Sequence, residues 1–167
     1  MITFKGAPLT LIGKQAKIGQ RAFDFKLISQ DLKEVKLSDF YGKIKVVNFF
    51  PSLDTPVCDL QVKEFNKKAA GLSPDIVVIG VSKDLPFAQA RFCSLNEIKN
   101  EVVLSDYRFS SFGLNYGFLI KELNLLARGT IIIDQNQRIR YIQLVSEITH
   151  SVNFEEVFNS LQGLLKV

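Results

Sequence analysis

A nearly unbroken apolar run that ends at a proline constrains this chain most. Residues 44–50 read Ile-Lys-Val-Val-Asn-Phe-Phe, and Pro51 follows them directly. A run of this length and composition predicts a central strand that is covered on both of its faces. Pro51 ends the strand, because proline has no N–H to donate to a neighbouring strand. The middle of a β-sheet is therefore predicted at residues 44–50.

Other short apolar runs alternate with helical patterns along the chain. We predict further strands at 23–28, around Val35, and at 76–81, 102–104, 127–133 and 139–144, the last two forming a hairpin. Helices are predicted at 56–71, 85–95 and 109–116 and over the amphipathic segment 154–165. Residues 2–5 and 9–12 flank Gly6-Ala7-Pro8 and predict a small hairpin ahead of the main sheet. This alternation favours an α/β protein.

Length and charge narrow the class of function. The 167 residues are 47% apolar and 23% charged, which fits one ordinary folded domain. The net charge of +4 is scattered along the chain without a basic block, so we expect no nucleic-acid partner. No positively charged leader and no membrane-length apolar run are present, so we expect a cytoplasmic protein without a membrane partner.

The two cysteines, Cys58 and Cys93, are the residues that most suggest chemistry. Two cysteines are too few for a secreted disulfide scaffold, and with a single histidine they do not form a four-ligand zinc set. We therefore expect no metal, and redox or catalytic use becomes the leading explanation for both residues.

Cys58 follows a predicted helix start. Asp54 or Thr55 can cap the helix, and Pro56 suits its first position. With Thr55 as the cap, Cys58 is the third helical residue and lies near unpaired N–H groups and the positive end of the helix dipole, which favour a thiolate. Its helix face continues through residues 62, 65, 69 and 72, so Cys58 should form the floor of a pocket. The alternative is that Cys58 is merely a small core residue.

The segment around Cys58 resembles a known family signature. Pro51, Thr55 and Cys58 match the Pro-x-x-x-Thr-x-x-Cys pattern of the peroxiredoxins. The similarity to the thiol peroxidase subfamily, the atypical two-cysteine peroxiredoxins, covers most of the chain and includes segments 4–6, 46–48, 51–59, 125–128 and 133–134. It implies a thioredoxin-like fold with a central mixed β-sheet flanked by helices. It also implies a single domain over residues 1–167, with an additional N-terminal β-hairpin at 1–13.

The resemblance also implies a role for each matched residue. Cys58 would be the peroxidatic nucleophile that attacks hydrogen peroxide or an organic hydroperoxide. The Thr55 hydroxyl would contact both the sulfur and the bound peroxide, and Arg128 would supply a cation and hydrogen-bond donors. Pro51 would shield the sulfur from water. Without the resemblance, Thr55 is a helix cap, Arg128 a surface ion-pair residue and Pro51 a strand terminator.

Cys93 is the second cysteine of the implied cycle. The resemblance makes it the resolving cysteine, which condenses with the Cys58 sulfenic acid to form an intramolecular disulfide. The apolar positions 85, 88, 92 and 95 predict that Cys93 lies beside the buried stripe of its helix, near the rim of the protein. A partly exposed bystander is the alternative. The resemblance further implies recycling by a thioredoxin-type reductant, a homodimer and no cofactor.

Two rival functions remain open from the sequence. A thiol–disulfide oxidoreductase of the same fold typically carries Cys-x-x-Cys at a helix start, whereas this helix start holds only Cys58. A non-enzymatic peroxide sensor would pass its disulfide to a partner protein and would differ from an enzyme mainly in turnover.

Overall fold

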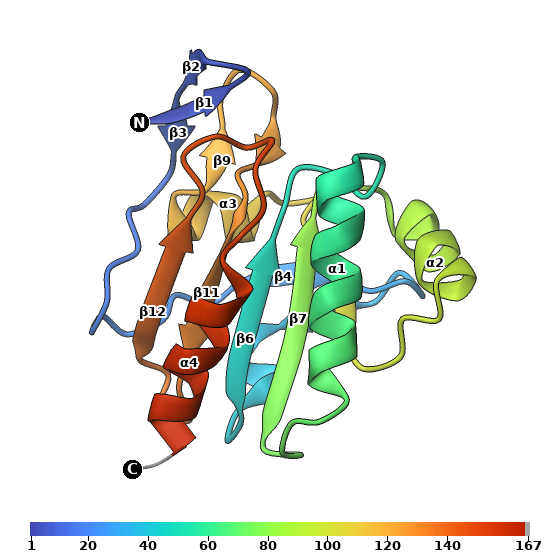
Figure 1. Cartoon of the computed structure of the whole chain (residues 1–167), viewed down its shortest axis with the longest axis vertical. Helices are drawn as coiled ribbons and strands as arrows, with labels where there is room; N and C mark the ends of the chain where they lie inside the picture. Colours follow the sequence, from blue (N-terminus) through green and yellow to red (C-terminus); the bar gives the residue numbers. More distant parts are fainter. Residues whose placement is uncertain (166–167) are drawn as a thin grey trace.

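A seven-stranded mixed sheet organises the protein (Figure 1), in a computed structural model that describes residues 1–165. From one edge to the other the strands are β12 (Ile139–Leu144), β11 (Gly129–Ile133), β6 (Ile44–Phe49), β7 (Ile76–Ser82), β8 (Val102–Ser105), β4 (Lys26–Ile28) and β5 (Glu34–Lys36). Strands β6, β7 and β8 are parallel, and the outer strands pair antiparallel. The sheet confirms the predicted mixed α/β architecture.

Strand β6 lies at the centre of the helix-covered part of the sheet, as its apolar run predicted. All six of its residues are buried, between β11 on one side and β7 on the other. The strand ends at Phe49, and the chain continues through Phe50 and Pro51 toward the next helix. The carboxyl end of β6 therefore delivers the Pro51–Cys58 segment to one end of the sheet.

Helices cover both faces of the sheet. Helices α1 (Pro56–Ala69), α2 (Pro86–Leu95) and α4 (Phe154–Leu165) pack on one face, and α3 (Ser111–Tyr116) packs on the other. Figure 1 shows α1 and α4 in front of the sheet and α3 behind it. On the α3 side, Phe112 and Tyr116 pack against Phe49 and Phe118 in an aromatic cluster that anchors this layer.

The N-terminal hairpin is present, but its second arm differs from the prediction. Strands β1 (Ile2–Phe4) and β2 (Ala7–Leu9) pair antiparallel around a turn at Lys5-Gly6, so Ala7 and Pro8 belong to a strand. Strand β3 (Leu11–Ile12) leaves the hairpin and joins β9 (Leu119–Ile120) and β10 (Leu125–Leu126) in a separate small sheet. Strand β9 was not predicted, because two residues are too few to show a period.

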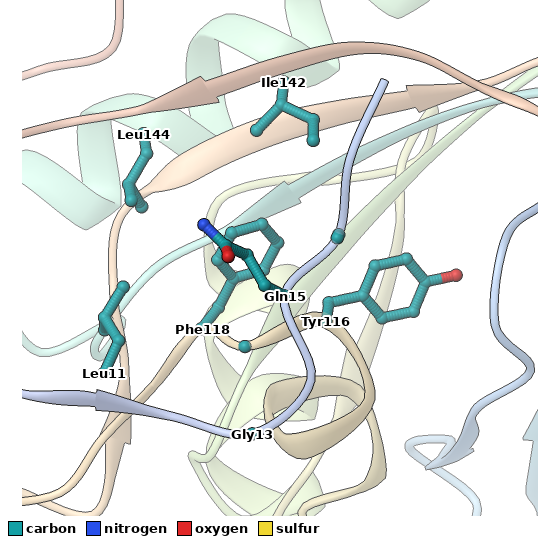
Figure 2. Close-up of a pocket in the computed structure, with 9 residues that line it drawn as sticks. Leu11, Gly13, Gln15, Tyr116, Phe118, Ile142 and Leu144 are labelled. Carbon is teal, nitrogen blue, oxygen red and sulfur yellow. The ribbon is translucent and has the colours of Figure 1, made fainter. Parts of the chain in front are cut away.

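Residues 13–16 run as an extended strap across the end of α3. The Lys14 N–H donates to Leu114 O at 2.7 Å, and a Cβ at Gly13 would lie 2.4 Å from that same oxygen. A glycine is therefore required at 13 for the close approach. A cavity of about 390 Å³ lies beside the strap. Figure 2 shows residues that line it, among them Ile142 and Leu144 of β12 across from the strap. Neither cysteine lines this cavity.

Candidate active site

Cys58 occupies the first turn of α1, as predicted. Thr55 is the N-cap in an extended conformation, and Pro56 is the first helical residue. The Thr55 hydroxyl donates to Ser52 O at 3.1 Å and accepts the Cys58 N–H at 3.4 Å. The sequence folds this way because a threonine cap satisfies an N–H group that has no helical partner and proline has none to satisfy. Cys58 is thus fixed at the amino end of the α1 dipole.

The Cys58 side chain is fully buried. It has no exposed surface and packs in a small apolar group that we call the cysteine cluster, formed by Phe50, Leu53, Cys58, Val62, Cys93, Ile98 and Val103, with Phe92 against it. The predicted stripe through Val62 and Phe65 is buried with it. Cys58 therefore lies at the base of the segment 51–58 rather than on the surface of the protein.

Arg128 is buried beside α1. Its side chain is 2% exposed, its Nε donates to Ile148 O at 2.8 Å, and its Nη1 donates to Gln61 Oε1 at 3.1 Å. Within residues 1–165 it forms no ion pair with a carboxylate. The alternative reading of Arg128 as a surface ion-pair residue is therefore wrong. A guanidinium without a carboxylate partner keeps its charge available to an anion or a peroxide oxygen.

Gln61 is a site residue that the sequence analysis missed. It lies one turn after Cys58 on α1 and is 1% exposed. Its Nε2 donates to Phe49 O at 3.2 Å, which orients its Oε1 toward Arg128. The available signal was a polar residue at position 61, directly beside the buried stripe position 62. A polar side chain next to such a stripe requires an internal partner when it is buried.

Three of the predicted site residues line one pocket. Cys58 has no exposed surface and does not line it, so its predicted position at the floor of a pocket was wrong. Pro51, Thr55 and Arg128 contribute to a cavity of about 390 Å³, together with residues from the N-terminal hairpin and the small sheet. The remaining lining residues are Phe4, Ser52, Pro56, Val57, Leu123, Leu125, Ile148 and Thr149. This wall is almost entirely apolar apart from Arg128 and the hydroxyl groups. Such a pocket accommodates a small polar group with an apolar substituent.

Cys93 lies on the buried face of α2, and the predicted position beside an apolar stripe was wrong. The inward residues of α2 are Pro86, Gln89 and Cys93, whereas Leu85 and Leu95 are 53% and 76% exposed. Gln89 causes this rotation, because its Nε2 donates to Ser82 Oγ at 3.0 Å and to Leu104 O at 2.9 Å. A buried amide with two acceptors fixes the helix more specifically than the leucines do.

The two cysteines are free thiols in the same cluster. Cys93 is 8% exposed, and Gln30 Nε2 donates to its Sγ at 3.4 Å. Burial raises the pKa of the Cys93 thiol from 9.0 to about 11, and the buried Glu101 carboxyl adds to the rise. Cys93 is therefore protonated at neutral pH while α2 remains packed.

A carboxylate joins the Cys58 loop to the start of α2. Asp84 accepts hydrogen bonds from Ser52 Oγ at 2.7 Å, from Leu53 N–H at 2.9 Å and from Ser82 Oγ at 2.6 Å. The segments that carry the two cysteines thus share one anchor. Asp84 was not singled out from the sequence, since its partners lie on a distant loop.

Comparisons with known proteins identify the family. The Redoxin family matches residues 17–161. A thiol peroxidase of Bacillus subtilis strain 168 is 45% identical over 165 residues, which cover 99% of this chain and 98% of that protein. A thiol peroxidase of Streptococcus pneumoniae strain R6 is 43% identical over 164 residues, which cover 98% of this chain and 100% of that protein. The chain belongs to the thiol peroxidase family. It is accordingly a peroxiredoxin-type, thiol-dependent peroxidase.

Solved structures agree with this assignment. A peroxiredoxin-like protein from Aquifex aeolicus has a TM-score of 0.92 and 40% identity, covering 98% of this chain and 96% of that one. A thiol peroxidase from Chromobacterium violaceum has a TM-score of 0.86 at 20% identity, covering 99% and 98%, and supports the fold. The thioredoxin-like fold expected from the resemblance is thereby confirmed.

No helix within residues 1–165 combines the length and the apolar character needed to cross a membrane. In the same part of the chain, no three histidine, cysteine, aspartate or glutamate side chains gather as they would around a metal ion.

Proposed function

We propose that this thiol peroxidase reduces hydrogen peroxide and organic hydroperoxides through Cys58 as the peroxidatic cysteine. The Cys58 thiolate attacks one peroxide oxygen, the O–O bond breaks, and the sulfur becomes a sulfenic acid. The departing oxygen takes a proton and leaves as water or an alcohol. The observation that carries this proposal is the position of Cys58 in the first turn of α1, directly under the N-cap hydroxyl of Thr55.

Thr55, Arg128 and Pro51 assist the attack. Thr55 can donate to the thiolate and accept from the peroxide O–H, a dual role open to a hydroxyl. Arg128 stabilises the charge that develops on the departing oxygen, and its burial strengthens that interaction. Pro51 is buried in the pocket wall and keeps water from the sulfur. The shared pocket of these three residues supports their assignment to one reaction.

Cys93 completes the cycle as the resolving cysteine. Its sulfur attacks the Cys58 sulfenic acid, the S–O bond breaks, water leaves, and an intramolecular disulfide forms. A reduced thioredoxin-type protein then restores both thiols. Both cysteines are almost completely buried, so a reductant reaches the disulfide only if the Cys93 segment opens. The presence of both cysteines in one cluster supports this pairing.

The wider setting of the enzyme is also a proposal. Residues 1–167 form a single thioredoxin-like domain with residues 1–13 as its N-terminal extension, and the protein acts in the cytoplasm as a homodimer. The scattered charge of the chain supports a soluble setting.

The decisive experiment compares peroxide consumption and disulfide formation in wild type, Cys58→Ser and Cys93→Ser proteins. Cys58→Ser should abolish both, since no other residue carries the attacking sulfur. Cys93→Ser should consume about one equivalent of peroxide and then stop, with thioredoxin as the reductant, while Cys58 accumulates as sulfenic acid; each step to a higher acid would consume one further equivalent. Ser94→Ala, which changes an exposed neighbour on α2, should behave as wild type.

Two results would redirect the proposal. Full activity in Cys58→Ser would remove the nucleophile assignment. Oxidation of the wild-type protein that stays stoichiometric with a complete thioredoxin system, together with a trapped mixed disulfide, would favour the peroxide sensor over the enzyme.

A further inference from the structure

A buried asparagine–glutamate pair lies beside the cysteine cluster. Glu101 ends the connection 96–101 between α2 and β8 and is 7% exposed, and Asn48 of β6 has no exposed surface. Asn48 Nδ2 donates to Glu101 Oε1 and, at 3.1 Å, to Ile79 O. Among residues 1–165, neither Asn48 Oδ1 nor Glu101 Oε2 has a hydrogen-bond partner, and both atoms are buried. The protein itself thus satisfies the polar atoms of the pair incompletely.

The pair separates the cysteine cluster from the rest of the core. On the same sheet face, Val46 belongs to the cluster under α1 and α4, whereas Phe50 belongs to the cysteine cluster. Asn48 lies between these two residues on β6. Gly80 of β7 has no side chain and so leaves room for the Glu101 carboxyl, since a Cβ there would lie 2.7 Å from Glu101 Oε1. The pair therefore lies at the boundary between the cysteine cluster and the cluster under α1 and α4.

Within residues 1–165, no cation forms an ion pair with the Glu101 carboxyl. The groups around it are the Asn48 amide from β6, Gly80 from β7 and the Cys93 thiol from α2. Burial raises the pKa of Glu101 from 4.5 to about 8, and the hydrogen bond from Asn48 lowers it. A protonated carboxyl is neutral and can donate as well as accept a hydrogen bond, so the neutral acid suits this buried position better than a carboxylate does.

We infer that Glu101 is a positioning residue of the resolving step: paired with Asn48, its carboxyl holds the connection 96–101 and Cys93 against the sheet while protonated, and its ionisation releases them. The inference rests on the proposed role of Cys93 in disulfide formation. Protonation of Glu101 thereby controls when the Cys93 thiol is available for the resolving step.

Few other contacts hold the connection closed. Ile98 inserts into the cysteine cluster, and Asn66 Oδ1 of α1 accepts the Lys99 and Asn100 N–H groups at 3.0 and 2.8 Å. The contact between Glu101 and Asn48 is the inner attachment to the sheet. Opening therefore exposes Glu101 to water, where a carboxyl returns to its ordinary pKa and loses its proton at neutral pH.

The pH dependence follows from the direction of the shift. The pKa of Glu101 is about 8 in the closed form and near 4.5 when solvated, so the closed form binds the proton more tightly. Closure is fully favoured below about pH 4.5 and weakens as the pH rises toward 8, by about tenfold in the opening constant per pH unit. Ionisation of the Cys93 thiol raises the opening constant further only above pH 9.0, the pKa of the solvated thiol.

The test measures opening directly by amide hydrogen exchange of residues 86–101 in the reduced protein between pH 5.5 and 8.0, corrected for intrinsic exchange. The opening constant of the wild-type protein should increase about tenfold for each unit of pH, whereas that of Glu101→Gln should not change with pH. Glutamine keeps the size of the side chain, and its amide can donate to Asn48 Oδ1. Glu101→Met, an apolar residue of similar length, should also be independent of pH. Glu97→Gln, an exposed change in the same connection, should follow wild type.

A second readout separates this inference from the proposed function. In a single turnover at pH 7, Glu101→Gln should slow disulfide formation at least about tenfold and leave the rate of Cys58 oxidation unchanged. The same pH dependence of exchange in wild type and Glu101→Gln would overturn the inference while leaving Cys93 as the resolving cysteine. Normal turnover in Cys93→Ser would instead overturn the proposed function, whatever the exchange data show.

Discussion

At the scale of single residues, the contact between Gln61 and Arg128 explains how a buried cation is oriented without a carboxylate. Gln61 Oε1 accepts from Arg128 Nη1 at 3.1 Å, and Ile148 O accepts from Nε at 2.8 Å. These neutral acceptors fix the plane of the guanidinium without neutralising its charge. The sequence indicated Cys58, Thr55 and Arg128 through a spaced motif. It did not indicate Gln61, because the hydrogen bonds of this side chain run to Arg128 and to main-chain oxygens of β6 and β11, which are distant in the sequence.

Replacing Gln61 by leucine tests this orientation. Gln61→Leu leaves Arg128 Nη1 without its acceptor and allows the guanidinium to rotate, so peroxide oxidation of Cys58 should slow by about 10-fold to 100-fold. Stopped-flow measurement of the first oxidation step at several peroxide concentrations gives this rate. Gln135→Leu, an exposed glutamine, serves as the control and should have no effect. An unchanged rate in Gln61→Leu would mean that Arg128 needs no such support.

At the scale of elements, helix starts were predicted well where the capping side chain is local. Thr55 and Pro56 indicated α1, and the structure confirms that start. Helix α3 is different, since its N-cap residue Ser110 makes no capping hydrogen bond. Instead, the carboxylate of Asp106, four residues before Ser110, accepts from the Phe112 and Gly113 N–H groups at 3.0 and 2.9 Å. The inward face of α2 was likewise predicted wrongly. Hydrogen bonds from Gln89 to Ser82 and Leu104 turn the Gln89 face of the helix inward, and the leucines at 85 and 95 stay exposed.

Asp106 should therefore matter more to stability than Ser110. Asp106→Ala leaves two buried N–H groups of α3 without an acceptor and should lower the free energy of unfolding by about 1–2 kcal/mol. Urea denaturation of the reduced protein measures this difference. Ser110→Ala removes a side chain at the nominal cap position and should cost less than about 0.5 kcal/mol. Equal losses in the two variants would contradict the assignment of the cap to Asp106.

At the scale of the whole molecule, one glutamate fastens the N-terminal hairpin beside the pocket. Glu147 accepts from Thr3 Oγ1 at 2.7 Å and from the Lys5 and Gly6 N–H groups at 2.9 and 3.1 Å. The Thr3 hydrogen bond, followed by those of the backbone, lowers the pKa of Glu147 to about 2. The attachment is therefore present above pH 4.5 and is lost as the pH falls toward 2. The hairpin was predicted from the sequence, but this long-range contact was not.

Loosening the hairpin should affect bulky substrates first. Phe4 of the hairpin lines the pocket, so Glu147→Gln should reduce the catalytic efficiency for an aromatic hydroperoxide by about tenfold, because one apolar contact is lost. Hydrogen peroxide makes no such contact and should be reduced at nearly the wild-type rate. Steady-state assays with both peroxides measure this difference in catalytic efficiency. Glu34→Gln on the distant strand β5 serves as the control. Equal losses for both peroxides would indicate a general effect on the active site instead.

The proposed catalytic cycle depends most on the pairing of Cys58 with Cys93 after oxidation. Mass spectrometry of the wild-type protein, treated with one equivalent of peroxide without a reductant and digested under non-reducing conditions, examines this pairing directly. The proposed cycle predicts one dominant cross-linked species that joins the peptides containing Cys58 and Cys93, lighter than the two free peptides by two hydrogen atoms. A Cys58 peptide that carries added oxygen while Cys93 remains a free thiol would contradict it.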